Sequence, residues 1–288
     1  MDLEHPLTDV NDAYERLTQG ELENLGIVLG AYRSLLGPRR KLLAYVSMPI
    51  TTGLRLRNVC IEHGATGPAD LTVKLGKDAL WELVIQPNIR EGVAFADGLG
   101  RSREDLLWIA PSVFEAKKWR WSQDAYMSLW YRVIGEMAGR HVVMDGWQYS
   151  TGGVLEVMFS LFMRWRMIRP YTEKLATQIF GIKNFLPDMP HQERLKEFEA
   201  MWQMRVYDAS GREILIDEIL SMIVAAIEDL RAHGLAYQDL VGPAYKIMQT
   251  PILSPCSASG GYPDRPPSAM TDLYENARTR IKAIAHAA

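Results

Sequence analysis

The chain has 288 residues, of which 48% are hydrophobic and 23% are charged, and its formal net charge is −3. This composition is typical of a soluble globular protein with a hydrophobic core, and the length suits one large domain or one domain with a helical extension. Proteins that bind DNA or RNA normally carry a basic patch or stripe, so the charge balance predicts that no nucleic-acid polymer is a partner.

The two cysteines, Cys60 and Cys256, lie far apart in the sequence. This favours a reduced cytoplasmic protein over a disulfide scaffold, with one bridge between them as the alternative. The N-terminus lacks an apolar signal segment, and the longest apolar runs fall far short of the roughly 20 residues that span a bilayer. No group of cysteines and histidines has the spacing of a zinc site. We therefore expect a cytoplasmic protein without membrane contact, metal or other cofactor.

Helix and strand patterns alternate from the N-terminus onward. Residues 11–36 have the spacing of one or two amphipathic helices, broken at Gly20. The apolar run 42–47 predicts a buried parallel strand. The turn after it, residues 48–53, is rich in small and hydroxyl side chains. In an open α/β sheet, such a turn lies where ligands bind.

The alternation continues through the middle of the chain. Residues 64–76 are ambiguous, and residues 77–99 have helical spacing with a kink or a break at Pro87. Residues 106–111 read as a second short strand followed by a loop. The clearest helix covers residues 122–138, where an apolar stripe recurs at helical spacing: Tyr126, Leu129, Trp130, Val133, Ile134 and Met137.

This helix has well-marked ends, because Ser122 can cap its start and Gly139 can end it. A strand over residues 141–144 follows, and then a strongly apolar helix over residues 154–163. Strands that alternate with helices indicate an α/β fold with a parallel sheet. We expect a flavodoxin- or Rossmann-like sheet with helices on both faces, extended by N-terminal helices and a C-terminal helical region.

The sequence after Pro170 reads mainly as helices. They are expected over residues 171–185, 192–206, 216–233 and 269–285, with a turn at 208–211 and a long Pro/Gly-rich loop at 250–267. The predicted organisation is therefore an N-terminal helical segment (1–38), an α/β core (39–170) and a helical extension (171–288).

A polar, Gly-rich stretch joins the strand 141–144 to the helix 154–163, in which Glu156 is the only charged residue. An acid in the first turn of a helix is stabilised by the helix dipole by ~0.3–1 kcal/mol, which is one interpretation of Glu156. The other is functional. Because its neighbours are apolar, the carboxylate must face a polar cavity or lose its hydration at a considerable cost.

The start of the same helix offers Ser150, Thr151, Gly152 and Gly153, which supply hydroxyl groups and unobstructed backbone amides. A helix N-terminus binds anions readily, so these are candidate binding residues, with ordinary turn chemistry as the alternative. Asp145, at the carboxyl end of the preceding strand, is either a second functional acid or a turn-forming residue.

Aromatic residues gather just before the helix 122–138, where Trp119 and Trp121 flank Arg120. Such side chains suit stacking against a planar base, and the alternative is a small hydrophobic cluster beneath the loop. The six histidines are scattered, and no triad or metal pattern is evident among them.

Two segments of the chain resemble one protein family. Residues 45–51 read Tyr-Val-Ser-Met-Pro-Ile-Thr, and residues 146–156 read Gly-Trp-Gln-Tyr-Ser-Thr-Gly-Gly-x-x-Glu. Together with the aromatic helix start at Trp121, they are similar to the nucleoside 2-deoxyribosyltransferase-like superfamily, which includes deoxynucleotide and nucleotide N-glycoside hydrolases. The resemblance covers roughly residues 41–165. It departs from the family at Met48, where the family turn usually carries glycine before proline.

The resemblance implies cleavage of the N-glycosidic bond of a nucleoside or nucleotide. Glu156 would attack the anomeric carbon through an oxocarbenium-like transition state, with Asp145 and Tyr45 as further catalytic candidates. Water would resolve the glycosyl-enzyme in a hydrolase, and a second base would do so in a transferase. Ser150 would hold a sugar hydroxyl, a phosphate or Glu156 itself. The other implied substrate-binding residues are Ser47, Met48, Pro49, Trp119, Trp121, Trp147, Thr151, Gly152 and Gly153.

Members of this family assemble as dimers or larger oligomers, so the resemblance also implies a homo-oligomer. Two other functions fit the sequence. One is a non-catalytic nucleotide-binding sensor that uses the same loop, and the other is an interaction protein whose helical half is the functional surface. Loss of activity in Glu156→Gln would favour the enzyme over both.

Overall fold

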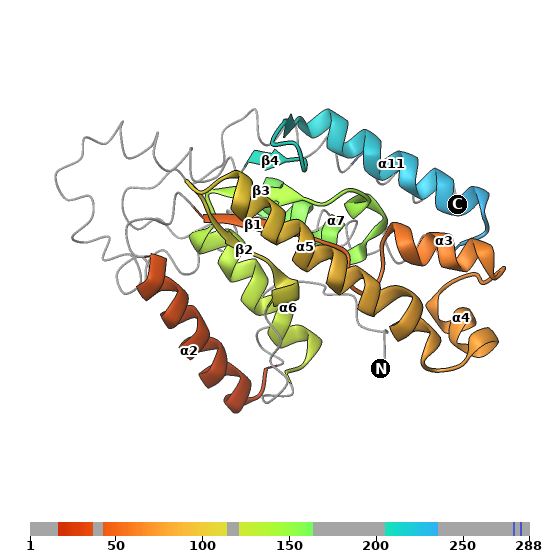
Figure 1. The fold of residues 1–288 in the computed structure, drawn as a ribbon, viewed down its shortest axis with the longest axis horizontal. Helices are drawn as coiled ribbons and strands as arrows, with labels where there is room; N and C mark the ends of the chain where they lie inside the picture. The colour runs from red at the N-terminus through yellow and green to blue at the C-terminus, as the bar shows by residue number, and fades with distance from the viewer. Residues whose placement is uncertain are drawn as a thin grey trace.

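The computed structural model describes residues 17–36, 43–113, 121–163 and 205–235, together with residues 279 and 283. These residues form a mixed α/β fold around one five-stranded sheet, which is parallel except at one edge (Figure 1). The sheet order is β2-β1-β3-β4-β5. Its strands are β1 (Leu43–Ser47), β2 (Leu107–Ile109), β3 (Arg140–Val143), β4 (Arg205–Tyr207) and β5 (Glu213–Ile214).

Strand β1 lies at the centre of the parallel part, between β2 and β3. All five of its residues are buried, as expected for a continuous apolar run in a parallel sheet. In the register with β3, Tyr45 lies opposite His141 and Ser47 lies opposite Val143. The carboxyl ends of β1 and β3 therefore meet at the same edge of the sheet.

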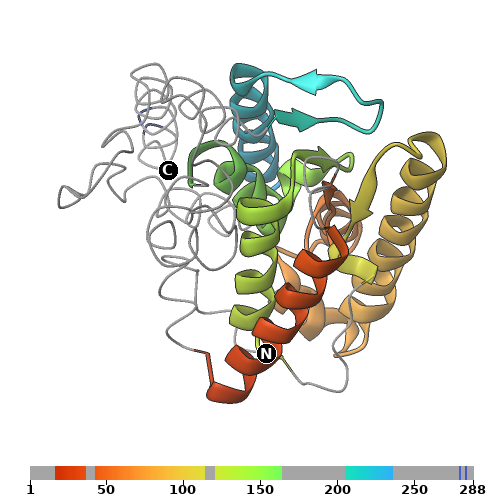
Figure 2. The ribbon, with the colours of Figure 1, turned by 90° about the vertical axis from the view of Figure 1, so that its left-hand side faces the viewer.

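Helices cover both faces of the sheet, as Figure 2 shows with α5 (Gln86–Ser102) and α6 (Gln123–Arg132) on opposite sides. Successive side chains of a strand point to opposite faces. Accordingly, Val46 packs with Ala96 of α5, whereas Tyr45 belongs to the main core with α6. This alternation decides which side chains of β1 share a face with Glu156.

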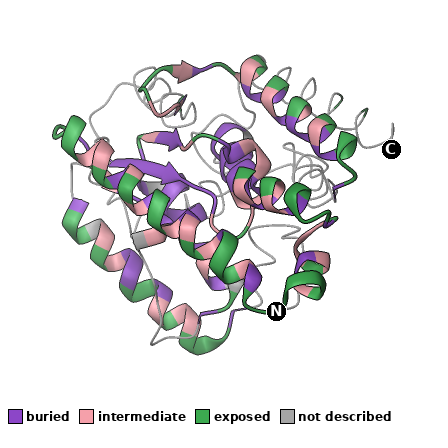
Figure 3. Ribbon diagram, turned by 45° about the vertical axis from the view of Figure 1, so that its right-hand side comes forward, coloured by how far each residue is buried: buried purple, intermediate pink, exposed green. Residues whose placement is uncertain are grey.

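The second face is the more heavily covered one. Besides α6 it carries α7 (Thr151–Met158) and α2 (Gln19–Leu36), whose residues belong to the same core cluster. Glu21 of α2 accepts a 2.8 Å hydrogen bond from the backbone amide of Ser122, which anchors α2 at the start of α6. In Figure 3 the central strands and α7 are buried, while the outer sides of the surrounding helices are exposed.

Three further helices lie around the edge of the sheet where β1 and β3 end. They are α3 (Leu54–Glu62), α4 (Pro68–Leu75) and α11 (Ile216–Ala232) (Figure 1). Helix α11 buries an apolar stripe that includes Ile219, Ile223 and Ile227, as its amphipathic sequence predicts. No helix among the described residues is long and apolar enough to cross a membrane.

The structure resolves two uncertain stretches of the sequence. The ambiguous residues 64–76 contain α4, which starts at Pro68 and ends before Gly76, the usual places for these residues. The expected break near Pro87 is a change of helix type. A π-helical stretch, Trp81–Ile85, passes directly into α5, and Pro87, which cannot donate a helical hydrogen bond, lies at this change of helix type.

Two predicted helices are confirmed, each with a π-helical stretch inside its predicted range, and the second begins at Thr151, three residues earlier than expected. Ser122 caps α6 by accepting a hydrogen bond from Ala125, and the helix continues as the π stretch Val133–Met137. Helix α7 continues likewise as Phe159–Met163. The expected break at Gly20 agrees with the structure to within one residue, because Leu17 and Thr18 are not helical and α2 begins at Gln19.

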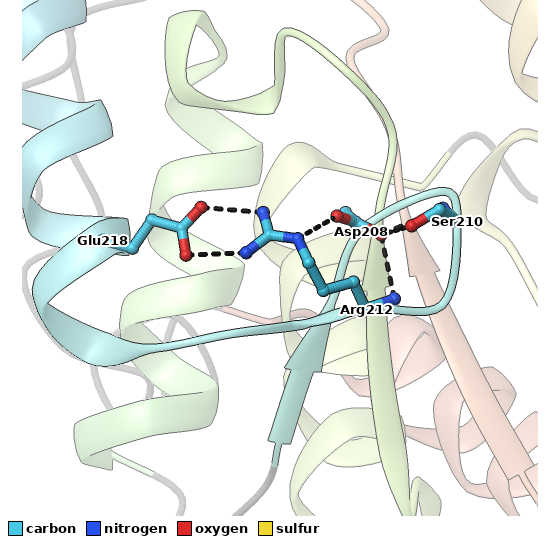
Figure 4. Close-up of polar contacts among 4 residues, drawn as sticks. All are labelled: Asp208, Ser210, Arg212 and Glu218. Atoms are coloured by element: carbon cyan, nitrogen blue, oxygen red, sulfur yellow. Dashed lines mark hydrogen bonds and ion pairs between the residues drawn. The ribbon is translucent and has the colours of Figure 1, made fainter.

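The expected helix over residues 192–206 is wrong at its end, because residues 205–207 form β4. The turn at 208–211 accordingly joins β4 to β5. Asp208 makes this turn tight by accepting hydrogen bonds from Ser210 and Arg212, and Arg212 forms a bidentate ion pair with Glu218 of α11 (Figure 4).

Because β4 pairs with β3, the sheet extends past residue 170, where the helical extension was expected to begin. The helix expected over 216–233 is present as α11. The expected helix 171–185 and the loop 250–267 lie outside the described residues, as does the helix 269–285 apart from residues 279 and 283.

Candidate functional site

Two loops meet at the carboxyl ends of β1 and β3. We call residues 48–53 the β1 loop and residues 144–150 the β3 loop. The backbone amide of Gly53 donates a 3.0 Å hydrogen bond to the carbonyl of Tyr149, which joins the two loops directly. From α5, the buried Asn88 side chain donates to the carbonyls of Ile50 and Thr52, at 3.0 and 3.1 Å, and so fixes the β1 loop.

Glu156 lies on α7, the helix that begins where the β3 loop ends. The phenol of Tyr45 donates a 2.7 Å hydrogen bond to its Oε1, and the hydroxyl of Ser47 donates to its Oε2. Tyr45 and Ser47 are two positions apart on β1 and therefore point to the same face of the sheet. The Glu156 residue is only 6% exposed. Three residues predicted for the site are thus brought together in the core.

The protonation of Glu156 follows from this environment. Burial raises the pKa of its carboxyl group to about 7, and the hydrogen bonds from Ser47 and Tyr45 lower the pKa but do not offset the burial. The carboxyl group therefore changes its charge near neutral pH. Burial, and next the charge of Glu156, raise the pKa of Tyr45 well above its ordinary value, so the phenol stays neutral and acts as the donor.

Tyr131 is a second buried phenol near Glu156, and no pattern in the sequence singles it out. It is 1% exposed, and its ring packs 4.7 Å from that of Phe159, one turn beyond Glu156. Burial and the charge of Glu156 raise its pKa. Within the described part of the chain its hydroxyl has no hydrogen-bond partner. A buried hydroxyl without a partner is costly, which marks this position as unusual.

His141 lies on the other side of Tyr45, with the ring centroids 5.3 Å apart and the planes at 82°. Its Nδ1 is 2.6 Å from the hydroxyl of Ser160, which donates a 2.9 Å hydrogen bond to the carbonyl of Glu156. Ser160 must therefore accept from Nδ1–H, and Nε2 carries no proton. Burial lowers the His141 pKa to about 3, so the ring is neutral at physiological pH.

Ser150 caps α7 and does not contact Glu156. Its hydroxyl accepts a 3.3 Å hydrogen bond from the amide of Gly153 and one of 3.2 Å from the hydroxyl of Thr52. The amide of Thr151 donates to the same Thr52 hydroxyl, at 3.3 Å. These contacts show capping and turn chemistry, the structural alternative for this stretch, and they connect the two loops a second time.

Gly153 is required by packing, whereas Gly152 is not. A Cβ atom on Gly153 would lie 2.8 Å from the carbonyl oxygen of Trp147, but one on Gly152 would meet nothing closer than the Ser150 hydroxyl at 4.0 Å. The β3 loop therefore packs tightly against the start of α7. This packing fixes the position of the helix that carries Glu156.

Other predicted site residues lie apart from the carboxylate. Met48 packs on the opposite face of the sheet with Val46, against Gly92 of α5, because strand alternation turns it away from Glu156. Pro49 packs against Gly53, whose Cβ would lie 2.5 Å from it. Asp145 is exposed at the end of β3.

Of the aromatic residues predicted for the site, Trp121 and Trp147 are described by the structure, and both are buried in the hydrophobic core. Trp147 is 1% exposed, and Trp121 packs edge-on against Tyr126 at 5.5 Å. Trp119 lies outside the described residues. The hydrophobic-cluster interpretation thus fits Trp121, and Trp147 acts as the large side chain beneath the β3 loop.

A separate surface cavity of about 420 Å³ lies between α5 and β2, lined by Asp97, Arg101 and Trp108 among others. It is away from the Glu156 site, on the α5 side of the sheet. No group of three or more His, Cys, Asp or Glu side chains in the described ranges is placed to hold a metal ion. Comparisons of the chain with family models, with curated proteins and with solved structures found no match.

Proposed function

We propose that this protein cleaves the N-glycosidic bond of a nucleoside or nucleotide, with Glu156 as the nucleophile. The observation that carries the proposal is the carboxylate of Glu156, held by Tyr45 and Ser47 at the carboxyl ends of two adjacent parallel strands. In doubly wound sheets, ligands bind outside this edge, at the point where the strand order reverses. The order β2-β1-β3-β4 supports a flavodoxin-like sheet, in which β1 and β3 flank that point.

The proposed reaction has two steps. An oxygen of Glu156 forms a bond to the anomeric carbon while the bond from that carbon to the base nitrogen breaks, and the base leaves with the electron pair and takes up a proton from solvent. Water then attacks the anomeric carbon, loses a proton to solvent and displaces the Glu156 carboxylate, giving the free sugar, or the sugar phosphate if the substrate is a nucleotide. If a second base attacks in place of water, the products are a new nucleoside and the first base.

The surroundings of Glu156 suit this chemistry. Positive charge develops at the anomeric carbon in an oxocarbenium-like transition state, and a carboxylate shielded from water stabilises such charge more strongly than an exposed one. Tyr45 and Ser47 hold the carboxylate in one orientation. Because Glu156 is 6% exposed, the side chains above it must move to admit a sugar.

A screen of nucleosides and their 5′-monophosphates for release of free base, with and without a second base, tests the proposal. The wild type and Glu156→Gln are compared with Glu218→Gln, a matched control in an exposed ion pair. We expect the wild type and Glu218→Gln to release base from at least one compound and Glu156→Gln to lose this activity. Equal activity in all three proteins would contradict the role of Glu156.

A second candidate function is a non-catalytic nucleotide sensor, which the burial of Glu156 favours. It predicts that a nucleotide raises the melting temperature without any release of base. For either function we propose a cytoplasmic homo-oligomer. The buried free thiol of Cys60 supports a reducing compartment. Light scattering on the purified protein measures the oligomeric state.

A further inference from the structure

One ion pair joins α3 to α11 beside the β3 loop. Arg57 donates from Nε and Nη2 to the two carboxylate oxygens of Asp229, both at 2.6 Å, across 172 positions of sequence. The side chains are 20% and 27% exposed. Bidentate pairs of arginine with carboxylate have a fixed geometry, and partial burial reduces their screening by salt.

Tyr149 of the β3 loop is the third member of this cluster. The Arg57 guanidinium lies 6.0 Å from the centroid of the Tyr149 ring, and the Tyr149 side chain helps to lower the pKa of Asp229, after the larger effect of Arg57. The ring of Tyr149 therefore packs against the ion pair, while its carbonyl accepts the hydrogen bond from Gly53 of the β1 loop. Tyr149 directly precedes Ser150, the cap of α7.

We propose that Arg57 and Asp229 are positioning residues, which act through Tyr149 to fix the β3 loop and thereby the start of the helix that carries Glu156. The effect of the ion pair on catalysis rests on the proposed function, whereas its effect on the position of the β3 loop is independent of that function. Neither residue of the pair is hydrogen-bonded to Glu156. The tie would make α11, which follows Glu156 by 60 residues or more in the sequence, part of the machinery that aligns the carboxylate.

Helix α11 is also held by its apolar face. That helix buries Leu220, Ile223 and Ile227, among others, and this apolar stripe is independent of Asp229. A second bidentate pair, Arg212 with Glu218, ties the opposite end of α11 to the β4–β5 turn (Figure 4). Both pairs join an arginine to a carboxylate of α11. Of the two, the pair of Arg57 with Asp229 is the one that contacts the β3 loop.

The two ion pairs at the ends of α11 can be compared by mutation. Asp229→Asn removes one charge with little change in shape, Asp229→Glu restores the charge, and Glu218→Gln makes the equivalent change at the other end of α11. Amide hydrogen exchange of the full chain is measured at Gly53 and Gly153, whose N–H groups report on the junction of the loops and on the cap of α7. Base release is measured in the same proteins as kcat and KM.

We expect exchange at Gly53 and Gly153 to be about fivefold to tenfold faster in Asp229→Asn, the change that loss of roughly 1–1.4 kcal/mol of local stability produces. Asp229→Glu should recover part of the protection, and Glu218→Gln should leave both amides unchanged. In the active enzyme, kcat should fall about tenfold or more in Asp229→Asn, because a small misplacement of a reacting group is costly.

Unchanged exchange in Asp229→Asn, or an equal increase in Glu218→Gln, would overturn the proposal. So would faster exchange with an unaltered kcat. If the wild type releases no base from any compound, the proposed function fails, and the exchange measurement alone decides whether the ion pair positions the loop.

Discussion

The phenol of Tyr45 donates a 2.7 Å hydrogen bond to Oε1 of Glu156, connecting the central strand to α7 inside the core. Because hydrogen bonds to charged groups are stronger than those to neutral groups, this contact favours the ionised carboxylate. It opposes the burial of Glu156, which favours the neutral form. The charge of Glu156 near neutral pH therefore depends on this one phenol and on Ser47.

Removing the Tyr45 hydroxyl should shift the titration of Glu156. In Tyr45→Phe the carboxyl loses a hydrogen bond that lowers its pKa, so we expect the acidic limb of the pH–rate profile to move to higher pH. The free energy of unfolding at pH 8 should fall by about 1–3 kcal/mol, because a buried charged group loses a partner.

Tyr131→Phe is the matched comparison for that variant. The Tyr131 hydroxyl has no partner among the described residues, so its removal should leave the free energy of unfolding unchanged or raise it slightly. Chemical denaturation of both variants at pH 8 measures the difference. Equal destabilisation by the two substitutions would contradict the account of the Tyr45 hydrogen bond.

The free energy of unfolding should depend on pH because the pKa of Glu156 is raised in the folded protein. Below pH 4.5 the carboxyl is protonated in both the folded and the unfolded chain, so it has no effect. Between pH 4.5 and 7 the unfolded chain ionises while the folded one keeps the proton, so this group lowers stability as the pH rises, and the loss levels off above pH 7. The rise in pKa from 4.5 to about 7 corresponds to a loss on the order of 3 kcal/mol.

Glu156→Gln should abolish this part of the pH dependence. Relative to the wild type, the variant should therefore gain stability between pH 4.5 and pH 8, which urea unfolding at several pH values measures. Glu218→Gln, at an exposed ion pair, corrects for changes in surface charge. A stability difference between wild type and Glu156→Gln that stays constant across this range would show that the Glu156 pKa is not raised in the folded protein.

The close packing of the β3 loop predicts opposite outcomes at two adjacent glycines. Gly153→Ala should lower the free energy of unfolding by about 1–3 kcal/mol, because its Cβ would lie 2.8 Å from the Trp147 carbonyl. Gly152→Ala has room and lies in a helix, so it should be neutral or stabilising by up to about 1 kcal/mol. Thermal unfolding of the two variants checks this, and a reversed order would be inconsistent with the packing.

The sequence was informative where local patterns decide the structure. The apolar runs predicted β1 and β3, the polar turns predicted the loops that follow them, and the apolar neighbours of Glu156 indicated a carboxylate out of water. Tyr45 and Ser47 were assigned to the site by the family resemblance, and the hydrogen bonds that they donate to Glu156 were not predicted. The burial of Trp147 and the outward position of Asp145 depend on how the β3 loop packs, which no local pattern reports.

Other features depend on contacts distant in sequence. Asp229 reads as one more acid on an amphipathic helix, and only the folded chain brings it to Arg57. Strand β4 is three residues long and is stabilised by pairing with β3 and β5, so its periodicity is too short to identify it. Met48 was assigned to the site because it lies in the β1 loop sequence, although strand alternation places it on the other face.

The most direct test of the central claim is to trap the covalent intermediate. The nucleoside or nucleotide found by the base-release screen would be prepared with fluorine at C2 of the sugar, which slows breakdown of a glycosyl-enzyme. We predict that mass spectrometry will find one added glycosyl group per chain, located on Glu156 and absent from Glu156→Gln. A label on another residue, or equal labelling of Glu156→Gln, would contradict Glu156 as the nucleophile.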